Sequence, residues 1–509
     1  MSEGHVPAAD TVDAPAEEAH PASTPERGST RAARLRRIFI WAGIVTLAGL
    51  TLLALVNLVS DIDAVLSIRG GRAAILGRLA PSLILGFLAL ALVVLVSWLS
   101  ASGRRREIAA IAIGFIALLG LRIFLSATFD GVTTGEPQAY SDRAEAVLGG
   151  DLSFGDRPMG YTWLLAGSFG LFGDRQLATE ALNLLLATLV GASVLAMARG
   201  LYGPRVGAIA LLGYALWPAG ALMTTVRMPE TAYDLAIVTA ALALTTTASG
   251  WRGSALVGAL LAISQWLRPS TPALLPAFLL ARIWPGGPWR RLVGGGFVPL
   301  LLAFLVVLAP VIWHNVQENG ALSISTSRFG GQVLYLGTNE ASGGTFDREA
   351  MEALVEISGP DLADRSAVGT RIALERIRED PLGIAALAVR KQGTLWGTER
   401  FGVEYGISRS LLKRPTHPRA ATAILLSQAF YFMVLLGATA GLYMVRRRAD
   451  RLAVLVVALI WTVAGIHTLL EVRDRHHSYV IPLLLPLAAL ALAGLLGRIE
   501  RLLGRSAPE

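Results

Sequence analysis

The polar segment from Ala127 to Tyr161 combines acids and arginines between two apolar stretches. Its acids are Asp130, Glu136, Asp142, Asp151 and Asp156, and its arginines are Arg143 and Arg157. A carboxylate can accept the proton of an attacking hydroxyl group, and a guanidinium can hold a phosphate while negative charge develops on it. The same composition also occurs in loops that are simply solvated. Composition therefore leaves a catalytic and a structural interpretation of this loop open.

The chain as a whole has the composition of a membrane protein. Of its 509 residues, 53% are hydrophobic and 16% are charged, and the mean hydropathy is +0.55. A soluble protein of this size cannot bury so much apolar surface, which predicts a polytopic membrane protein. The net charge of +8 comes from arginines beside apolar stretches, so it indicates membrane topology and not nucleic-acid binding. The absence of cysteine excludes thiolate sites.

The apolar stretches predict roughly twelve transmembrane helices with both termini in the cytoplasm. Arginine-rich turns mark the cytoplasmic side, except that Arg69, Arg72 and Arg78 fall in the first external turn. We divide the chain into a disordered cytoplasmic tail (1–35), two N-terminal helices (36–106), a transmembrane core (107–313) containing the external acidic loop (127–160), an external domain (314–419), C-terminal helices (420–497) and a cytoplasmic tail (498–509). The acidic loop and the external domain then lie on the external face of the cytoplasmic membrane.

Several short motifs follow one another along residues 108–496. They are Tyr140-Ser141-Asp142 with Gly149-Gly150, Arg157-Pro158-Met159-Gly160-Tyr161, Glu230, Leu267-Arg268-Pro269, Pro310-Val311-Ile312-Trp313-His314-Asn315, Lys391, Trp396, and Arg475 with Tyr479. In this order the chain resembles the GT-C membrane glycosyltransferases, in the branch with bacterial protein O-mannosyltransferase-like and aminoarabinose-transferase-like enzymes. The resemblance implies an all-α GT-C fold and a sugar donor linked to polyprenyl phosphate, held beside membrane lipid. The acceptor would be a glycan, a lipid or a protein.

The resemblance also implies a set of site residues. The catalytic base is Asp142 or Glu136, and we favour Asp142 because a Ser-Asp pair is typical of a helix start, although there it could serve only as a cap. The residues expected to bind substrate are Arg157, Tyr161, Glu230, Arg268, Lys391 and Arg475. Lys391 is one of two lysines in the chain, and its compact ammonium suits a phosphate.

No cofactor is implied. His476 and His477 have no third ligand at a suitable spacing, so a divalent metal is compatible with the sequence but has no support in it. Ionisable residues are nearly absent from the middles of the predicted spans, where transporters place them. This distribution favours an enzyme that acts at the outer leaflet. The alternative is a flippase for lipid-linked sugars or a non-catalytic membrane protein of cell-envelope assembly.

Overall fold

The computed structural model describes residues 27–67, 72–153, 157–247, 250–284, 293–320, 322–407 and 418–504. Every regular element among these residues is a helix, which confirms the all-α prediction. In this part of the chain, seven helices are long and apolar enough to cross a membrane. They are α1 (Arg27–Ser67), α2 (Arg72–Ser100), α3 (Arg104–Thr128), α6 (Arg175–Tyr202), η3 with α13 (Val293–Phe297, Val298–Asn319), α20 (Pro418–Val445) and η4 with α22 (Asp474–Val480, Ile481–Leu502).

Shorter helices occupy the other predicted spans. They are α7 (Pro204–Ala215), α8 (Pro218–Leu222), η1 (Met223–Thr225), α9 (Glu230–Thr246), α10 (Trp251–Leu267), η2 (Thr271–Leu274), α11 (Leu275–Ile283) and α21 (Arg451–Ile466). The chain bends by 55° between α7 and the pair of short helices that begins at Pro218. Proline lacks the amide hydrogen that would continue the helix and clashes with the preceding turn. The count of twelve membrane crossings remains a prediction.

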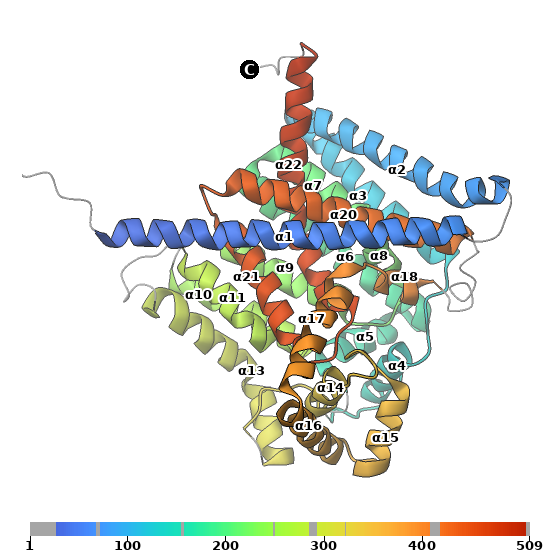
Figure 1. The fold of residues 1–509 in the computed structure, drawn as a ribbon, viewed down its shortest axis with the longest axis vertical. Coiled ribbons are helices and arrows are strands. Elements are labelled where there is room, and N and C mark those ends of the chain that lie inside the picture. The colour runs from blue at the N-terminus through green and yellow to red at the C-terminus, as the bar shows by residue number, and fades with distance from the viewer. Residues whose placement is uncertain are drawn as a thin grey trace, which may run out of the picture.

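The two N-terminal helices pack on the rest of the bundle. Helix α1 runs side by side with α20, and α2 packs against α3, α7 and α20 (Figure 1). Helix α1 begins at Arg27, eight residues before the predicted end of the N-terminal tail at residue 35, and the domain boundaries stay predictions. The helix includes the apolar run that starts near Ile38 and also the basic residues that precede this run. Residues 1–26 of the predicted tail lie outside the described residues.

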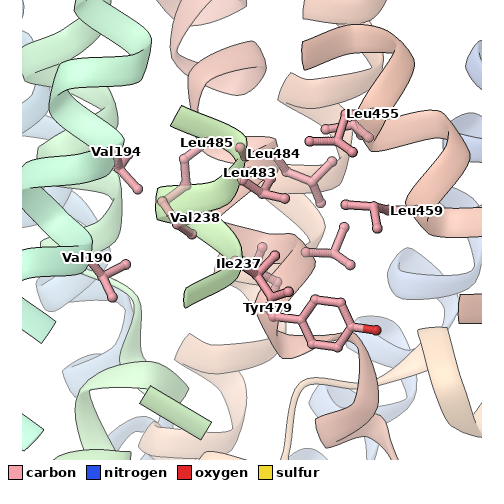
Figure 2. Close-up of a cluster of buried hydrophobic side chains, with 14 of the residues drawn as sticks. Val190, Val194, Ile237, Val238, Leu455, Leu459, Tyr479, Leu483, Leu484 and Leu485 are labelled. Carbon is pink, nitrogen blue, oxygen red and sulfur yellow. The ribbon is translucent and has the colours of Figure 1, made fainter. Parts of the chain in front are cut away.

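Aliphatic side chains fill the centre of the bundle. Val190 of α6, Ile237 of α9, Leu455 and Leu459 of α21, and Leu484 of α22 belong to this core (Figure 2). All five are at most 1% exposed. Helix α2 by contrast presents mostly exposed apolar side chains. An apolar outer surface over a packed interior is the arrangement expected of a protein in lipid.

The predicted cytoplasmic turns meet at one end of the bundle. Arg199 of α6 pairs with Glu107 of α3 at 2.6 Å, and Arg205 of α7 pairs with Glu500 of α22 at 2.7 Å. These contacts join the α2–α3 turn, the α6–α7 turn and the end of α22, which the arginine distribution assigned to the same side. The three segments therefore lie together at one end of the bundle.

The polar segment after α13 forms a group of short helices. They are α14 (Gly330–Gly337), α15 (Arg348–Ser358), α16 (Leu362–Glu379), α17 (Pro381–Gly397) and α18 (Phe401–Gly406). Helices α14, α15 and α16 gather at the lower end of the molecule in Figure 1. Helix α17 packs on α1 and η4, and α18 packs on α8, so the segment returns to the bundle before α20. Residues 408–417 of this segment lie outside the described residues.

The predicted topology can be tested by single-cysteine labelling, because the chain has no cysteine of its own. Ala341 lies in the polar segment and Arg447 in the turn after α20, and both are exposed. In intact cells, a membrane-impermeant thiol reagent should label Ala341→Cys and leave Arg447→Cys unlabelled until the membrane is opened. Labelling of Arg447→Cys from outside would contradict the predicted orientation.

Candidate active site

Two short helices in the acidic segment place its charged groups: α4 (Glu136–Leu148) and α5 (Met159–Phe172). Helix α4 follows Gly135, whose φ of +75° lies in the left-handed region that favours glycine. Its first turn contains Glu136 and Pro137, and proline is well suited to a position whose amide has no helical partner. The Glu136 side chain is 21% exposed and stands at the helix N-terminus, where the helix dipole favours a negative charge.

Glu136 is the centre of a charge cluster drawn from four parts of the chain. Its Oε2 accepts a hydrogen bond from Nη1 of Arg475 at 2.7 Å, and its Oε1 lies 3.7 Å from Nη1 of Arg157. Glu230, the first residue of α9, accepts from Arg268 and lies 3.7 Å from the same Nη1 of Arg475. Three guanidinium groups thus face two carboxylates. We call these five residues the charge cluster, and it carries a net positive charge.

Aromatic rings orient the arginines of the charge cluster. The guanidinium of Arg157 lies over the rings of Tyr140 and Phe329, at 5.6 and 5.4 Å from their centroids. Arg268 lies 5.7 Å over Tyr233, and Arg475 lies 5.1 Å over Phe401. Cation–π contacts of this kind restrict long side chains that would otherwise sample many rotamers. The cluster is therefore held in place before any ligand arrives.

Tyr161 was predicted to bind substrate, but it is fully buried. Its ring meets the ring of Tyr140 edge to face at 5.4 Å. In this structure Tyr161 supports Tyr140, which in turn lies beneath Arg157. Its role in substrate binding stays a prediction.

Asp142 lies elsewhere on α4. The helix begins six residues before it, so the prediction that Asp142 stands at the helix start is wrong: Gly135 and Pro137 set the start earlier than the Ser-Asp pair. Its side chain is exposed, and its Oδ1 accepts a hydrogen bond from Gln138 at 2.6 Å. No ion pair of the described residues includes Asp142. The structure brings Glu136, and not Asp142, together with the arginines.

Lys391 also lies apart from the charge cluster. It is fully buried, and its Nζ donates to the carbonyl oxygens of Gly337 at 2.8 Å and Thr468 at 3.2 Å. Burial lowers the pKa of its ammonium to about 8. Among the described residues it has no ion pair with the cluster. Of the cations expected to bind substrate, Arg157, Arg268 and Arg475 lie in the cluster and Lys391 does not.

The buried carboxylate of Asp234, next to the charge cluster, was not among the residues predicted from the sequence. Asp234 stands one helical turn after Glu230 on α9, is 4% exposed, and its Oδ1 has no hydrogen-bond partner within the part of the chain that is described. It lines a small cavity together with Glu230, Arg475, Glu399 and other residues. Asp234 is the fifth residue of α9 and lies near the start of the helix, not in its middle. The i, i+4 spacing of the two acids was the signal that could have revealed it.

Metal binding has no structural support in the residues that the structure describes. No three His, Cys, Asp or Glu side chains among them lie close enough together to hold an ion. His476 stacks on His467 with 4.5 Å between ring centroids, whereas His477 turns away and contacts Glu399. The two adjacent histidines therefore point to different surroundings.

Residues 156–314 match the family model for dolichyl-phosphate-mannose-protein mannosyltransferases, and this range contains Arg157, Glu230 and Arg268. The resemblance to GT-C membrane glycosyltransferases is confirmed over these residues. No curated protein sequence matches the chain.

Two crystal structures of ArnT from Cupriavidus metallidurans are similar to this chain. The one bound to undecaprenyl phosphate has 15% sequence identity and a TM-score of 0.35, with 75% of this chain and 76% of that chain covered. The apo form has 13% identity and a TM-score of 0.34, with 76% of this chain and 77% of that chain covered.

Proposed function

We propose that this protein is a GT-C glycosyltransferase of the cytoplasmic membrane. It transfers a sugar from a polyprenyl-phosphate donor to an acceptor hydroxyl group on the external face. The observation that carries the proposal is the charge cluster, in which three arginines face two carboxylates. One of these carboxylates, Glu136, is partly buried at a helix N-terminus and pairs with Arg475 and Arg157. The family whose model matches residues 156–314 is named for a polyprenyl-phosphate sugar donor, which supports the donor class.

The arginines suit a lipid phosphate. Guanidinium groups bind phosphate oxygens through short charge-assisted hydrogen bonds. Because the cluster carries a net positive charge, it can bind an anion while Glu136 remains in place. In this account Arg475, Arg157 and Arg268 hold the donor phosphate and stabilise the charge that grows on it as the sugar leaves.

Glu136 then acts as the general base. It takes the proton from the acceptor hydroxyl while the acceptor oxygen bonds to the anomeric carbon of the sugar. The bond from that carbon to the phosphate oxygen breaks, and polyprenyl phosphate leaves with the bonding electrons. Asp142 is exposed and has no arginine partner among the described residues, so we now favour Glu136 for this role.

Donor binding should make Glu136 a stronger base. Burial by itself raises the pKa of the Glu136 carboxyl, but Arg475 and Arg157 outweigh burial and hold the pKa below its usual range. A phosphate that binds these arginines competes for their charge and adds a negative charge nearby. Both effects raise the pKa of Glu136 in the donor complex.

This exchange predicts a difference between two pH profiles. The profile of kcat/KM reports the free enzyme, and that of kcat reports the substrate complex. A base must be deprotonated to act, so activity falls as the pH drops through its pKa. The acid limb of kcat should therefore lie at a higher pH than the acid limb of kcat/KM. Coincident limbs would show that donor binding leaves the pKa of Glu136 unchanged, and the reverse order would show that donor binding lowers it. Either result would contradict this account.

The sugar and the acceptor can be identified by mass spectrometry of envelope glycans, lipids and glycoproteins from a deletion strain. The proposal expects one glycan to lose a sugar unit and to regain it when the wild-type gene is restored. A variant with Glu136→Gln should not restore it. An unchanged set of glycans would count against a transferase.

A further inference from the structure

The segment that presents Arg475 is fastened to a distant segment by hydrogen bonds in both directions. Asp474 Oδ2 accepts the backbone amides of Arg400 at 2.8 Å and Phe401 at 2.9 Å. Glu399 Oε2 lies 2.7 Å from Nε2 of His477. Each segment thus receives one acidic side chain from the other. We call residues 399–401 and 474–477 the reciprocal clamp.

His477 is the most enclosed residue of the reciprocal clamp. It has no exposed surface, and its ring stacks between Trp396 and Tyr431 with centroid distances of 5.4 and 5.0 Å. Its Nδ1 donates to the carbonyl oxygen of Leu395 at 2.5 Å, which leaves Nε2 for Glu399. The ring therefore has both nitrogens engaged and both faces covered, so it has one orientation.

Arg475 lies inside the reciprocal clamp. It stands two residues before His477, and its guanidinium lies over Phe401, whose amide is held by Asp474. Its Nη1 reaches Glu136 at 2.7 Å. A shift of either clamp segment would move the backbone or the aromatic surface that fixes this guanidinium. A displacement near 1 Å at a reacting centre can cost about 100-fold in rate.

We propose that His477 and Glu399 are positioning residues that place Arg475 for the donor phosphate. This inference rests on the proposed function of the charge cluster. Neither residue touches the donor; they act by holding the two clamp segments at a fixed separation. Glu399 also accepts a hydrogen bond from Nε1 of Trp217 at 3.2 Å, so its carboxylate is held from a second side.

Two substitutions at one position separate positioning from folding. An asparagine amide nitrogen falls near the place of Nδ1, whereas a glutamine amide nitrogen falls near that of Nε2. His477→Asn should keep the contact with Leu395 and lose Glu399, so its kcat/KM for donor should fall about 100-fold. His477→Gln should keep the contact with Glu399 and most of the activity. Glu399→Ala removes the same hydrogen bond by changing its other partner. It takes the place of His477→Asn in this test if His477→Asn does not fold.

The matched control is Tyr202→Phe. It removes the 2.9 Å hydrogen bond from the Tyr202 hydroxyl to Asp450 at the opposite end of the bundle. It should lower thermal stability without changing KM for donor. The direct readout is binding of polyprenyl phosphate to detergent-purified protein, measured beside the melting temperature. His477→Asn should bind it more weakly than wild type, and His477→Gln should not.

The outcomes distinguish this inference from the proposed function. If Arg475→Ala binds polyprenyl phosphate as wild type does, the phosphate role of the charge cluster fails. If Arg475→Ala loses binding while His477→Asn and Glu399→Ala keep it, the positioning role fails and the charge cluster stands. Equal losses in His477→Gln and His477→Asn would also overturn the inference, because only one of them removes the bond to Glu399.

Discussion

Replacing Glu136 by glutamine is expected to reduce sugar transfer about 100- to 10,000-fold, the usual contribution of a general base. The amide keeps the size of the side chain and can still accept a hydrogen bond from Arg475. It cannot take up the acceptor proton. Because the substitution also releases the arginines from a competing carboxylate, binding of polyprenyl phosphate should be retained or tightened. The measurements are turnover of a defined donor and binding of polyprenyl phosphate, both with purified protein.

Asp142→Asn is the matched control for this prediction. It makes the same chemical change on the same helix, at an exposed side chain that contacts only Gln138 among the described residues. Its transfer rate should stay near that of wild type. The opposite pattern, with Asp142→Asn inactive and Glu136→Gln active, would restore Asp142 as the base.

Replacing Arg475 by alanine is expected to weaken both donor binding and catalysis. Its Nη1 lies between Glu136 and Glu230, at 2.7 and 3.7 Å, and in our account it moves to the donor phosphate. Loss of a donor aimed at developing charge costs on the order of 2–4 kcal/mol, so kcat/KM should fall roughly 30- to 1,000-fold. The assay is kcat/KM for donor together with binding of polyprenyl phosphate.

Arg475→Lys is the control for charge alone. Lysine keeps the positive charge but lacks the planar guanidinium that lies over Phe401. It should restore part of the binding lost in Arg475→Ala. If alanine at this position binds and transfers normally, Arg475 has a structural role only. A melting temperature for each variant shows whether a loss comes from unfolding, because alanine leaves Glu136 with less neutralising charge.

The sequence was sufficient to predict most of the helices and to name four residues of the charge cluster. Hydropathy located the apolar helices because a helix in lipid needs a long apolar stretch. Arg157, Glu230, Arg268 and Arg475 were all named from motif order. Their grouping in one cluster then follows from the helix packing that the structure provides.

The register of α4 and the long-range contacts could not be predicted. Two acids six residues apart in one loop both fit a helix start, and only the backbone at Gly135 decides between them. Glu136 meets Arg475, which lies 339 positions further along the chain, and sequence spacing carries no information about such a pair. The burial of Lys391 was equally hidden, because its partners are backbone carbonyl groups.

The central claim is that the charge cluster transfers sugar from a lipid donor and does not merely move the lipid. The most direct test uses purified protein in liposomes with a polyprenyl-phosphate sugar labelled in the sugar, and follows two products. Our account predicts that wild-type protein releases polyprenyl phosphate and passes the label to an acceptor, and that Glu136→Gln does neither. Label that crosses the bilayer while still bound to the lipid, with no polyprenyl phosphate released, would contradict the account and indicate a flippase.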